Sequence, residues 1–419
     1  MPTIEQQFTE DLKKLARLAV YRGVNLQAGQ GLLLTAPLEA VTLADYITET
    51  AYAAGAKDVL VIWENDETNR LRLERAPLTA LTHLPKWKLD VRNEAVRDHY
   101  AVLGIYGPNP DLLEGIDPGR VAAYTKARGE GLIPYYDDMM NDRMQWSLIA
   151  YPTRAWAHKV FPRETTTHAQ EKLLREVLRI SRIRPNVDPL TEWDAHNKRL
   201  HAAAAFMNSQ HFKQLHYRSQ GTDLVIRLPK RHLWSGGSAP SQVGVLFNAN
   251  IPTEEIYTLP DKRGVDGTVT SKKPLNCNGQ VIEEIRLTFK DGQVIDFGAR
   301  KGEAALGELL ASDAGARRLG EVALVPEKSP VAESGLIFYN TLFDENASCH
   351  LALGKAYPTC LEGGSSLHAE ALDREGVNDS IVHEDFMIGS ADLDIDGVRA
   401  DGTSVPVFRG GEWAFTFPS

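Results

Sequence analysis

The first half of the chain repeats one pattern, in which a short apolar segment is followed by a segment with helical spacing. Residues 31–35 (GLLLT), 58–63 (DVLVIW) and 100–106 (YAVLGIY) have the composition of strands. Residues 43–54 and 67–74, which lie between them, have the spacing of helices. Strands that alternate with helices form βαβ units, and these units place their strands parallel in one sheet. We therefore predict an N-terminal α/β domain with a mainly parallel sheet.

The second half of the chain has a different pattern. From Thr222 onward, short β segments are separated by turn residues such as Asp-Gly, which predicts a strand-rich α+β domain. A helical run over 191–211 precedes it, after a proline-containing break at 182–188. The length of 419 residues also favours more than one domain. We expect an α/β domain over residues 1–185 and an α+β domain that carries the chemistry over residues 186–419.

Charge and cysteine content narrow the class of protein. There are 46 Lys and Arg against 56 Asp and Glu, a net charge of −10, which argues against general affinity for nucleic acid or for anionic membranes. No segment approaches the roughly 20 apolar residues that cross a bilayer, and the N-terminus reads as an amphipathic helix without the apolar core of a secretion signal. The three cysteines form no CxxC, and they are interpreted as buried bystanders in a reducing compartment. A cytoplasmic protein is expected.

The usual nucleotide-binding fingerprints are missing from the α/β half. No GxGxxG follows the first predicted strand, and no GxxxxGK[ST] occurs in the chain. We therefore expect this half to act as a scaffold or lid.

Histidines and carboxylates of the second half are candidate metal ligands. In an extended strand residues i and i+2 point to the same face, so His383 and Asp385 can reach one ion. Taken alone, such a pair is more often simply exposed. His350 follows an acidic segment, 344–346, which is interpreted as a surface or site-edge loop. A lone histidine in that position is more often a core residue than a ligand.

Acidic residues next to apolar strands add to this set. Glu254 and Glu255 precede a predicted strand, although adjacent glutamates at a strand start usually face solvent. Glu321 lies beside the apolar run VALV, and a charge that enters a buried strand needs a partner. A metal would provide one, and so would Arg317 or Arg318.

Four further histidines lie close together in the chain. They form no HExxH motif, and a solvated or packed helix explains them. They are His196, His201, His211 and His216.

Several long segments, taken in order, resemble a known family. The segments NIPTEEIYT, GEVALV, NTLFDENASCHLALGKAY and NDSIVHEDFMIGS are similar, in order and spacing, to the aminopeptidase T/aminopeptidase S family of bacterial dinuclear metallopeptidases. The resemblance continues through 145–157 and 223–237, so it covers most of the chain. It implies a homodimer with a largely enclosed active site that admits short peptides with a free N-terminus.

The resemblance also implies roles for particular residues. The metal ligands that it implies are Glu255, Glu321, His350, His383 and Asp385. The implied catalytic tyrosine is Tyr357, and Glu254 becomes a proton-handling or supporting residue. Between the two adjacent glutamates, Glu255 is favoured as the ligand because the family's interval to the next ligand agrees best with it. Glu384 lies between two ligands on a strand, and we expect it to point the other way.

The chemistry of this residue set is consistent with two ions. Two divalent ions bring four positive charges, and three carboxylates with a bridging hydroxide would balance them. Two ions about 3.5–4 Å apart can deprotonate a bridging water and bind a substrate carbonyl. Glu321 is the candidate bridge, and the phenol of Tyr357 can donate a hydrogen bond to the developing oxyanion. Zinc, cobalt and manganese all accept such ligands.

These observations predict a metal-dependent aminopeptidase that hydrolyses the N-terminal peptide bond of oligopeptides. Two alternatives remain open at this stage. Another two-metal hydrolase, an amidase or a phosphoesterase, would use the same ligand types. A metal-binding or peptide-binding protein without catalysis would also retain the ligands.

Overall fold

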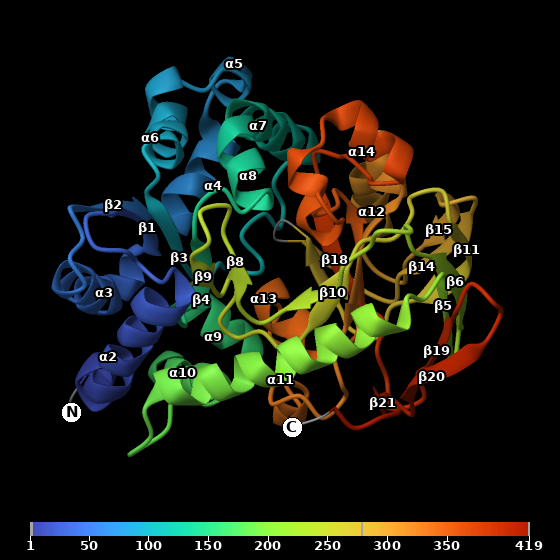
Figure 1. Cartoon of the computed structure of the whole chain (residues 1–419). Helices are drawn as coiled ribbons and strands as arrows, with labels where there is room; N and C mark the ends of the chain where they lie inside the picture. Colours follow the sequence, from blue (N-terminus) through green and yellow to red (C-terminus); the bar gives the residue numbers. More distant parts are fainter. Residues whose placement is uncertain (1–2, 278–279, 418–419) are drawn as a thin grey trace. The chain divides into compact units, whose positions relative to one another are not determined.

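The chain divides into two structural units, which are described separately. The computed structural model describes residues 3–277 and 280–417 (Figure 1). The first unit comprises Met1–Ala195 and Ser238–Pro252, and the second comprises His196–Gly237 and Thr253–Ser419. The first unit thus continues past the expected boundary at residue 185 and includes a later segment.

A four-stranded parallel sheet forms the centre of the first unit, with the strand order β2-β1-β3-β4. The strands are β1 (Gly31–Pro37), β2 (Asp58–Glu64), β3 (Ala101–Tyr106) and β4 (Trp146–Ala150). The predicted parallel α/β fold is therefore confirmed, and its three predicted strands are β1 to β3. The edge strand β4 was not predicted. Residues 238–252 contain the short strands β8 (Ala239–Pro240) and β9 (Leu246–Phe247).

Helices connect and flank these strands, as parallel strands require. They are α1 (Ile4–Gln7), α2 (Thr9–Leu18), α3 (Val41–Ala53), α4 (Asp66–Arg75), α5 (Leu78–Thr82), α6 (Lys86–Arg97), α7 (Pro118–Gly131), α8 (Ile133–Met140), α9 (Arg154–Val160) and α10 (Thr166–Ile180). The predicted N-terminal amphipathic helix corresponds mainly to α2, whose Leu12, Leu15 and Ala16 are fully buried. Among the helices of residues 3–277 and 280–417, none has the length and apolar character that crossing a bilayer requires.

The second unit contains two large antiparallel sheets. The helix α11 (Pro189–Gln210) begins in the first unit and leads into it. One sheet has the order β18-β17-β16-β10-β7, and the other has the order β15-β14-β11-β6-β5-β19-β20-β21. The strands of the first sheet are β7 (Ser235–Gly236), β10 (Ile256–Thr258), β16 (Leu319–Leu324), β17 (His350–Gly354) and β18 (His383–Met387).

The eight-stranded sheet and the smaller elements complete this unit. Its strands are β5 (Gln214–Ser219), β6 (Thr222–Arg227), β11 (Val265–Thr270), β14 (Arg286–Lys290), β15 (Gln293–Gly298), β19 (Asp394–Val398), β20 (Ser404–Arg409) and β21 (Glu412–Trp413). The pair β12 (Leu275–Cys277) and β13 (Gln280–Ile282) and the helices α12 (Glu303–Leu310), α13 (Thr341–Asp344) and α14 (Ala369–Glu375) lie among them. The strand-rich α+β prediction is confirmed.

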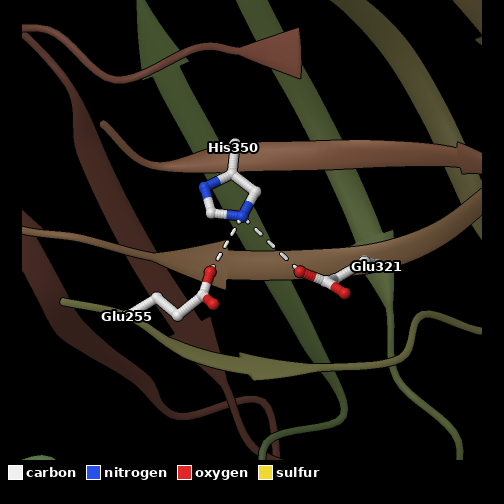
Figure 2. A group of neighbouring side chains, drawn as sticks. All are labelled: Glu255, Glu321 and His350. Atoms are coloured by element: carbon white, nitrogen blue, oxygen red, sulfur yellow. Dashed lines mark ion pairs between the residues drawn. The ribbon is translucent and has the colours of Figure 1, made fainter. Parts of the chain in front are cut away.

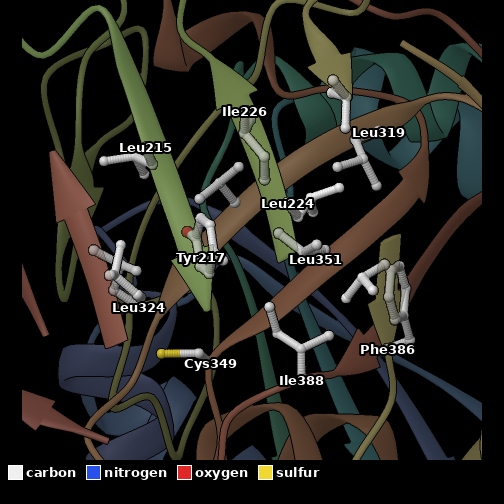
Figure 3. Close-up of a cluster of buried hydrophobic side chains, with 14 of the residues drawn as sticks. Leu215, Tyr217, Leu224, Ile226, Leu319, Leu324, Cys349, Leu351, Phe386 and Ile388 are labelled. Carbon is white, nitrogen blue, oxygen red and sulfur yellow. The ribbon is translucent and has the colours of Figure 1, made fainter. Parts of the chain in front are cut away.

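The two large sheets share one hydrophobic core. Leu215 and Leu224 from the eight-stranded sheet gather with Leu351 and Phe386 from the five-stranded sheet (Figure 3). Because side chains alternate along a strand, the residues between these core positions point to the opposite face of the five-stranded sheet. That second face carries most of the predicted metal ligands.

A β-bulge in β16 determines which residues reach that second face. The pairing of β16 with β17 shifts between Leu319, which lies opposite Leu353, and Glu321, which lies opposite Ala352. Leu319 belongs to the hydrophobic core (Figure 3), whereas Glu321 points to the other face. Residues two apart would share a face in a regular strand, so the extra residue, Gly320, changes the alternation. A Cβ atom on Gly320 would lie 2.3 Å from the Gly354 carbonyl oxygen, so this close approach requires glycine.

Candidate metal centre

Three of the predicted ligands meet at neighbouring strands (Figure 2). Glu255 directly precedes β10, Glu321 lies on β16, and His350 is the first residue of β17. His350 Nε2 lies 3.0 Å from Glu255 Oε2 and 3.5 Å from Glu321 Oε1. All three side chains are buried, and their ligand atoms lie within 4.8 Å of one another.

A second group forms beside the first and shares Glu321. His383 and Asp385 lie two residues apart on β18, and His383 Nε2 lies 3.6 Å from Asp385 Oδ1. The same nitrogen lies 3.6 Å from Glu321 Oε2. Glu321 therefore directs one carboxylate oxygen towards each group. The structure thus brings together all five predicted ligands, as two groups with one common carboxylate.

Main-chain carbonyls orient both histidine rings. His350 Nδ1 lies 3.1 Å from the Ser348 carbonyl oxygen, and His383 Nδ1 lies 2.7 Å from the Lys355 carbonyl oxygen. An Nδ1–H that donates to a carbonyl leaves Nε2 as the ligand atom, and Nε2 is the atom that faces the carboxylates. Both rings are therefore held with their ligand atoms directed into the centre.

The electrostatics of the centre favour a cation. Burial raises the pKa of Glu321, and the nearby charge of Asp385 raises it further. Burial alone would lower the pKa of His350, but the carboxylates of Glu255 and Glu321 raise it well above its usual range. A histidine that holds its proton this strongly reports a negative potential in the centre, and a divalent ion would meet the same attraction.

Two buried oxygen atoms provide a further test of whether these residues fit a metal. Asp385 Oδ1 and Glu255 Oε2 receive no hydrogen bond from the part of the chain that the structure describes. The 3.0 Å approach of Glu255 Oε2 to His350 thus lacks hydrogen-bond geometry. Buried carboxylate oxygens without donors are costly unless a cation binds them. The residues present therefore fit a metal centre of imidazole and carboxylate ligands.

Glu345 belongs to this region but was not predicted. It begins the 3₁₀ turn Glu345–Ala347 after α13, and its side chain is buried. Burial raises the pKa of Glu345 well above its usual value, and the charges of Asp385 and Glu255 raise it further. The sequence offered only its place in an acidic loop before a buried strand. A loop that carries two acids directly before a buried strand is a signal that could have identified it.

The other predicted site residues lie around these two groups. The ring of Tyr357 meets the His383 ring edge to face, with centroids 5.2 Å apart. Burial and then the charge of Glu321 raise the pKa of Tyr357 well above its usual value, so the phenol keeps its proton. Glu254 is buried next to Glu255 but is in neither group. Glu384 lies opposite Leu353 on the core face of β18, and it is also in neither group.

The cysteines do not form part of the centre. Cys277, Cys349 and Cys360 are all buried, and none of them forms a disulfide within the described residues. Cys349 precedes a ligand, but its sulfur contacts the main chain of Val325, and burial raises its thiol pKa to about 12. A thiol in that state is a poor nucleophile. The expectation that these residues are buried bystanders agrees with this structure.

Comparison with known proteins gives the same picture over nearly the whole chain. The chain is 51% identical over 409 residues to Aminopeptidase 2 of Geobacillus stearothermophilus, covering 98% of this chain and 99% of that protein. It is 44% identical to aminopeptidase AmpS of Bacillus subtilis (strain 168), covering 97% and 99% of the two chains.

A solved structure and a family model extend this similarity. The structure of wild-type AmpT from Thermus thermophilus is 40% identical and superposes with a TM-score of 0.89, covering 97% of this chain and all of that one. The family model described as thermophilic metalloprotease (M29) matches residues 8–413. These similarities show that the chain belongs to the thermophilic metalloprotease (M29) family.

Proposed function

We propose that this chain is an aminopeptidase that uses two divalent ions to remove the N-terminal residue of oligopeptides. The observation that carries the proposal is the shared carboxylate, because Glu321 faces one histidine–carboxylate group with each of its oxygens. A carboxylate with this placement is suited to bridge two ions. The relatives named as aminopeptidases support the choice of a peptide substrate.

The five ligands divide naturally between two positions. Glu255 and His350 would hold one ion, His383 and Asp385 would hold the other, and Glu321 would contact both. When bound, such ions would polarise a peptide carbonyl and lower the pKa of a water molecule. Zinc, cobalt and manganese are all compatible with imidazole and carboxylate ligands.

Glu345 would add a further negative charge beside the ligands. With Glu255, Glu321 and Asp385 it makes four buried carboxylates, which would balance the charge of two divalent ions. Burial is the main cause of its raised pKa, and repulsion from the charges of Asp385 and Glu255 adds to it.

Tyr357 is the proposed donor to the reacting carbonyl. Because its pKa is raised, the phenol remains protonated at neutral pH and can donate a hydrogen bond. Negative charge develops on the carbonyl oxygen during attack by water, and a fixed donor there stabilises it without being consumed. The contact with His383 holds the ring beside the ligands.

Glu254 is the proposed proton carrier. Its buried carboxylate lies next to a ligand in the chain, and a carboxylate in such an environment can accept a proton from water and deliver it to the departing amine. We further propose that the substrates are short peptides with a free amino terminus, and that the protein acts as a homodimer.

Metal removal is the first test of the proposed function. A chelator should abolish release of the N-terminal residue from a short peptide, and zinc, cobalt or manganese should restore it. The same peptide with an acetylated N-terminus should resist cleavage. Full activity of the metal-free protein would overturn the proposal, and equal cleavage of both peptides would indicate an amidase-type hydrolase instead.

The role of Tyr357 is tested by removing one oxygen atom. Tyr357→Phe should lower kcat by about 10²- to 10³-fold, the usual effect of losing an oxyanion donor, while metal affinity is unchanged. The control is Tyr217→Phe, because Tyr217 is a core tyrosine whose hydroxyl receives no hydrogen bond within the described residues. Turnover of Tyr357→Phe at the rate of this control would remove the proposed role.

A further inference from the structure

The segment that delivers Glu255 to the metal centre is held in an unusual way. Thr253, Glu254 and Glu255 precede β10, so they lie outside the regular part of the sheet. All three are nevertheless buried, with exposed fractions of 5%, 8% and 6%. Buried main-chain groups require hydrogen-bond partners, and outside a strand those partners must come from elsewhere.

The peptide unit between Thr253 and Glu254 is bound at both of its polar ends. The Thr253 carbonyl oxygen lies 2.7 Å from His196 Nε2. The Glu254 N–H donates to Asn346 Oδ1 over 2.7 Å. We infer that His196 and Asn346 form a peptide clamp, a pair of positioning residues that fixes the backbone from which Glu254 and Glu255 project.

The hydrogen bonds of His196 determine its role in the clamp. The Arg199 guanidinium lies 3.3 Å from His196 Nδ1, and because a guanidinium only donates, Nδ1 is the acceptor. Nε2 then carries the proton and donates it to the Thr253 carbonyl. The same Nε2 lies 3.7 Å from Glu254 Oε2. His196 is thus the packed member of the histidine group on and after α11, and only 3% of it is exposed.

Asn346 has equally well-defined partners. Its Nδ2 donates to the Leu342 carbonyl over 2.9 Å and lies 3.3 Å from Glu345 Oε1. Only one orientation of the amide satisfies these contacts while Oδ1 accepts from Glu254. Asn346 is fully buried, so no water competes for these bonds. It therefore connects the Glu254–Glu255 segment to the carboxylate of Glu345.

The clamp predicts an effect on both metal affinity and turnover. The expected effect on turnover rests on the proposed function, whereas the effect on metal affinity does not. Partners that orient ligands typically change affinity or activity by about 10- to 100-fold when they are removed. Because the clamp acts on the ligand's backbone and not on a substrate pocket, kcat should fall and KM should change little.

The test uses two substitutions of His196. One keeps the shape of the ring without its hydrogen-bond donor, and the other keeps a donor without the ring. His196→Phe keeps the ring and removes the donor, and His196→Gln keeps a donor at nearly the position of Nε2. Zinc affinity is measured on the full chain with a competing chromophoric chelator, and kcat and KM are measured on a short peptide. We expect His196→Phe to weaken zinc binding and kcat by about 10- to 100-fold. We expect His196→Gln to remain within about threefold of the natural protein.

Two control variants separate the clamp from general loss of stability. His201→Phe changes an exposed histidine on the same helix, and Leu351→Ala destabilises the core on the opposite face of the sheet. Neither should change zinc affinity. If His196→Phe does not fold, His196→Asn replaces it, because this smaller amide places its donor about one bond short of the carbonyl.

A double variant tests whether the two residues act on one peptide unit. The double variant His196→Phe/Asn346→Leu should lose less zinc affinity than the product of the two single fold-losses, because either change alone releases the same segment. The clamp is overturned if His196→Phe or its Asn replacement binds zinc like the natural protein, or if His196→Gln loses as much as His196→Phe. If zinc affinity depends on the clamp but the natural protein cleaves no peptide, only the proposed function is rejected.

Discussion

Ala352 provides a sharp test of how the five-stranded sheet separates the metal centre from the core. It lies opposite Glu321 on one side and opposite Asp385 on the other, and it is fully buried. Directly opposed side chains in an antiparallel sheet have Cβ atoms about 4.5–5.5 Å apart. The two methyl groups added by Ala352→Val would therefore enter the space through which both carboxylates reach the centre.

The size of this effect follows from the cost of overpacking. Added methyl groups in a well-packed site cost about 1–3 kcal/mol. If that cost falls on the position of the ligands, it weakens metal binding by roughly 5- to 150-fold, since each 1.4 kcal/mol is a factor of ten. The assay is a zinc titration against a competing chelator, with thermal melting recorded on the same samples.

The neighbouring residue is the control, because Leu351 points to the opposite face and lies in the hydrophobic core (Figure 3). Leu351→Ala should lower the free energy of unfolding by about 2–5 kcal/mol and leave zinc affinity unchanged while the protein is folded. If Ala352→Val binds zinc normally, or if Leu351→Ala weakens zinc binding below its melting temperature, the assignment of faces is wrong.

Three further predictions address other parts of the chain. Burial raises the pKa of Asp142 to about 7, so the folded state holds a proton that the unfolded state has lost, and stability falls as pH rises from about 4 to 7. Asp142→Asn should abolish this fall in stability and be more stable than the natural protein at pH 8 by up to about 4 kcal/mol. Equal urea midpoints of the two proteins at pH 8 would show that burial of this carboxylate does not cause the fall. Gly320→Ala should lower both the urea midpoint and the zinc affinity, because the new Cβ would lie 2.3 Å from the Gly354 carbonyl oxygen. An unchanged zinc affinity would show that the bulge does not position Glu321. Glu345→Gln should raise the melting temperature of chelator-treated protein and reduce the gain that zinc provides, since it removes one of the repelling carboxylates; a lower melting temperature without metal would refute this.

The fold was predictable where burial leaves a simple pattern in the chain. The strands β1 and β3 are apolar and mostly buried, as expected for the central strands of a parallel sheet. The edge strand β2 is also rich in apolar residues, although its side chains are partly or fully exposed. The strand β4 reads WSLIA, with a serine inside it, and its apolar run is too short to separate from the surrounding helices. Its pairing with β3 depends on tertiary packing, which local pattern does not encode.

The site was predictable to a similar degree and for similar reasons. His383 and Asp385 follow the two-residue period of a strand, so their common face could be inferred from the sequence. The remaining ligands were identified through the resemblance of several long segments to a known family. Glu345 and His196 were missed as site residues because their roles depend on partners distant in the chain. The partner of His196 is the main-chain carbonyl of Thr253, and because every residue has such a carbonyl, the sequence does not indicate this partner.

The bulge at Gly320 also determines where the strand β16 can change its length. With Gly320 bulged out, Leu319 and Glu321 lie opposite consecutive residues of β17, Leu353 and Ala352, and therefore point to opposite faces. Deleting Gly320 would keep both side chains on their present faces, because adjacent residues of a regular strand alternate.

A deletion in the regular part of the strand, such as that of Val322, would instead turn either Glu321 into the hydrophobic core or Leu324 onto the ligand face. We therefore expect deletion of Gly320 to keep Glu321 on the ligand face, whereas deletion of Val322 should remove metal binding and folding together. Insertions and deletions in the loops between these strands should be tolerated.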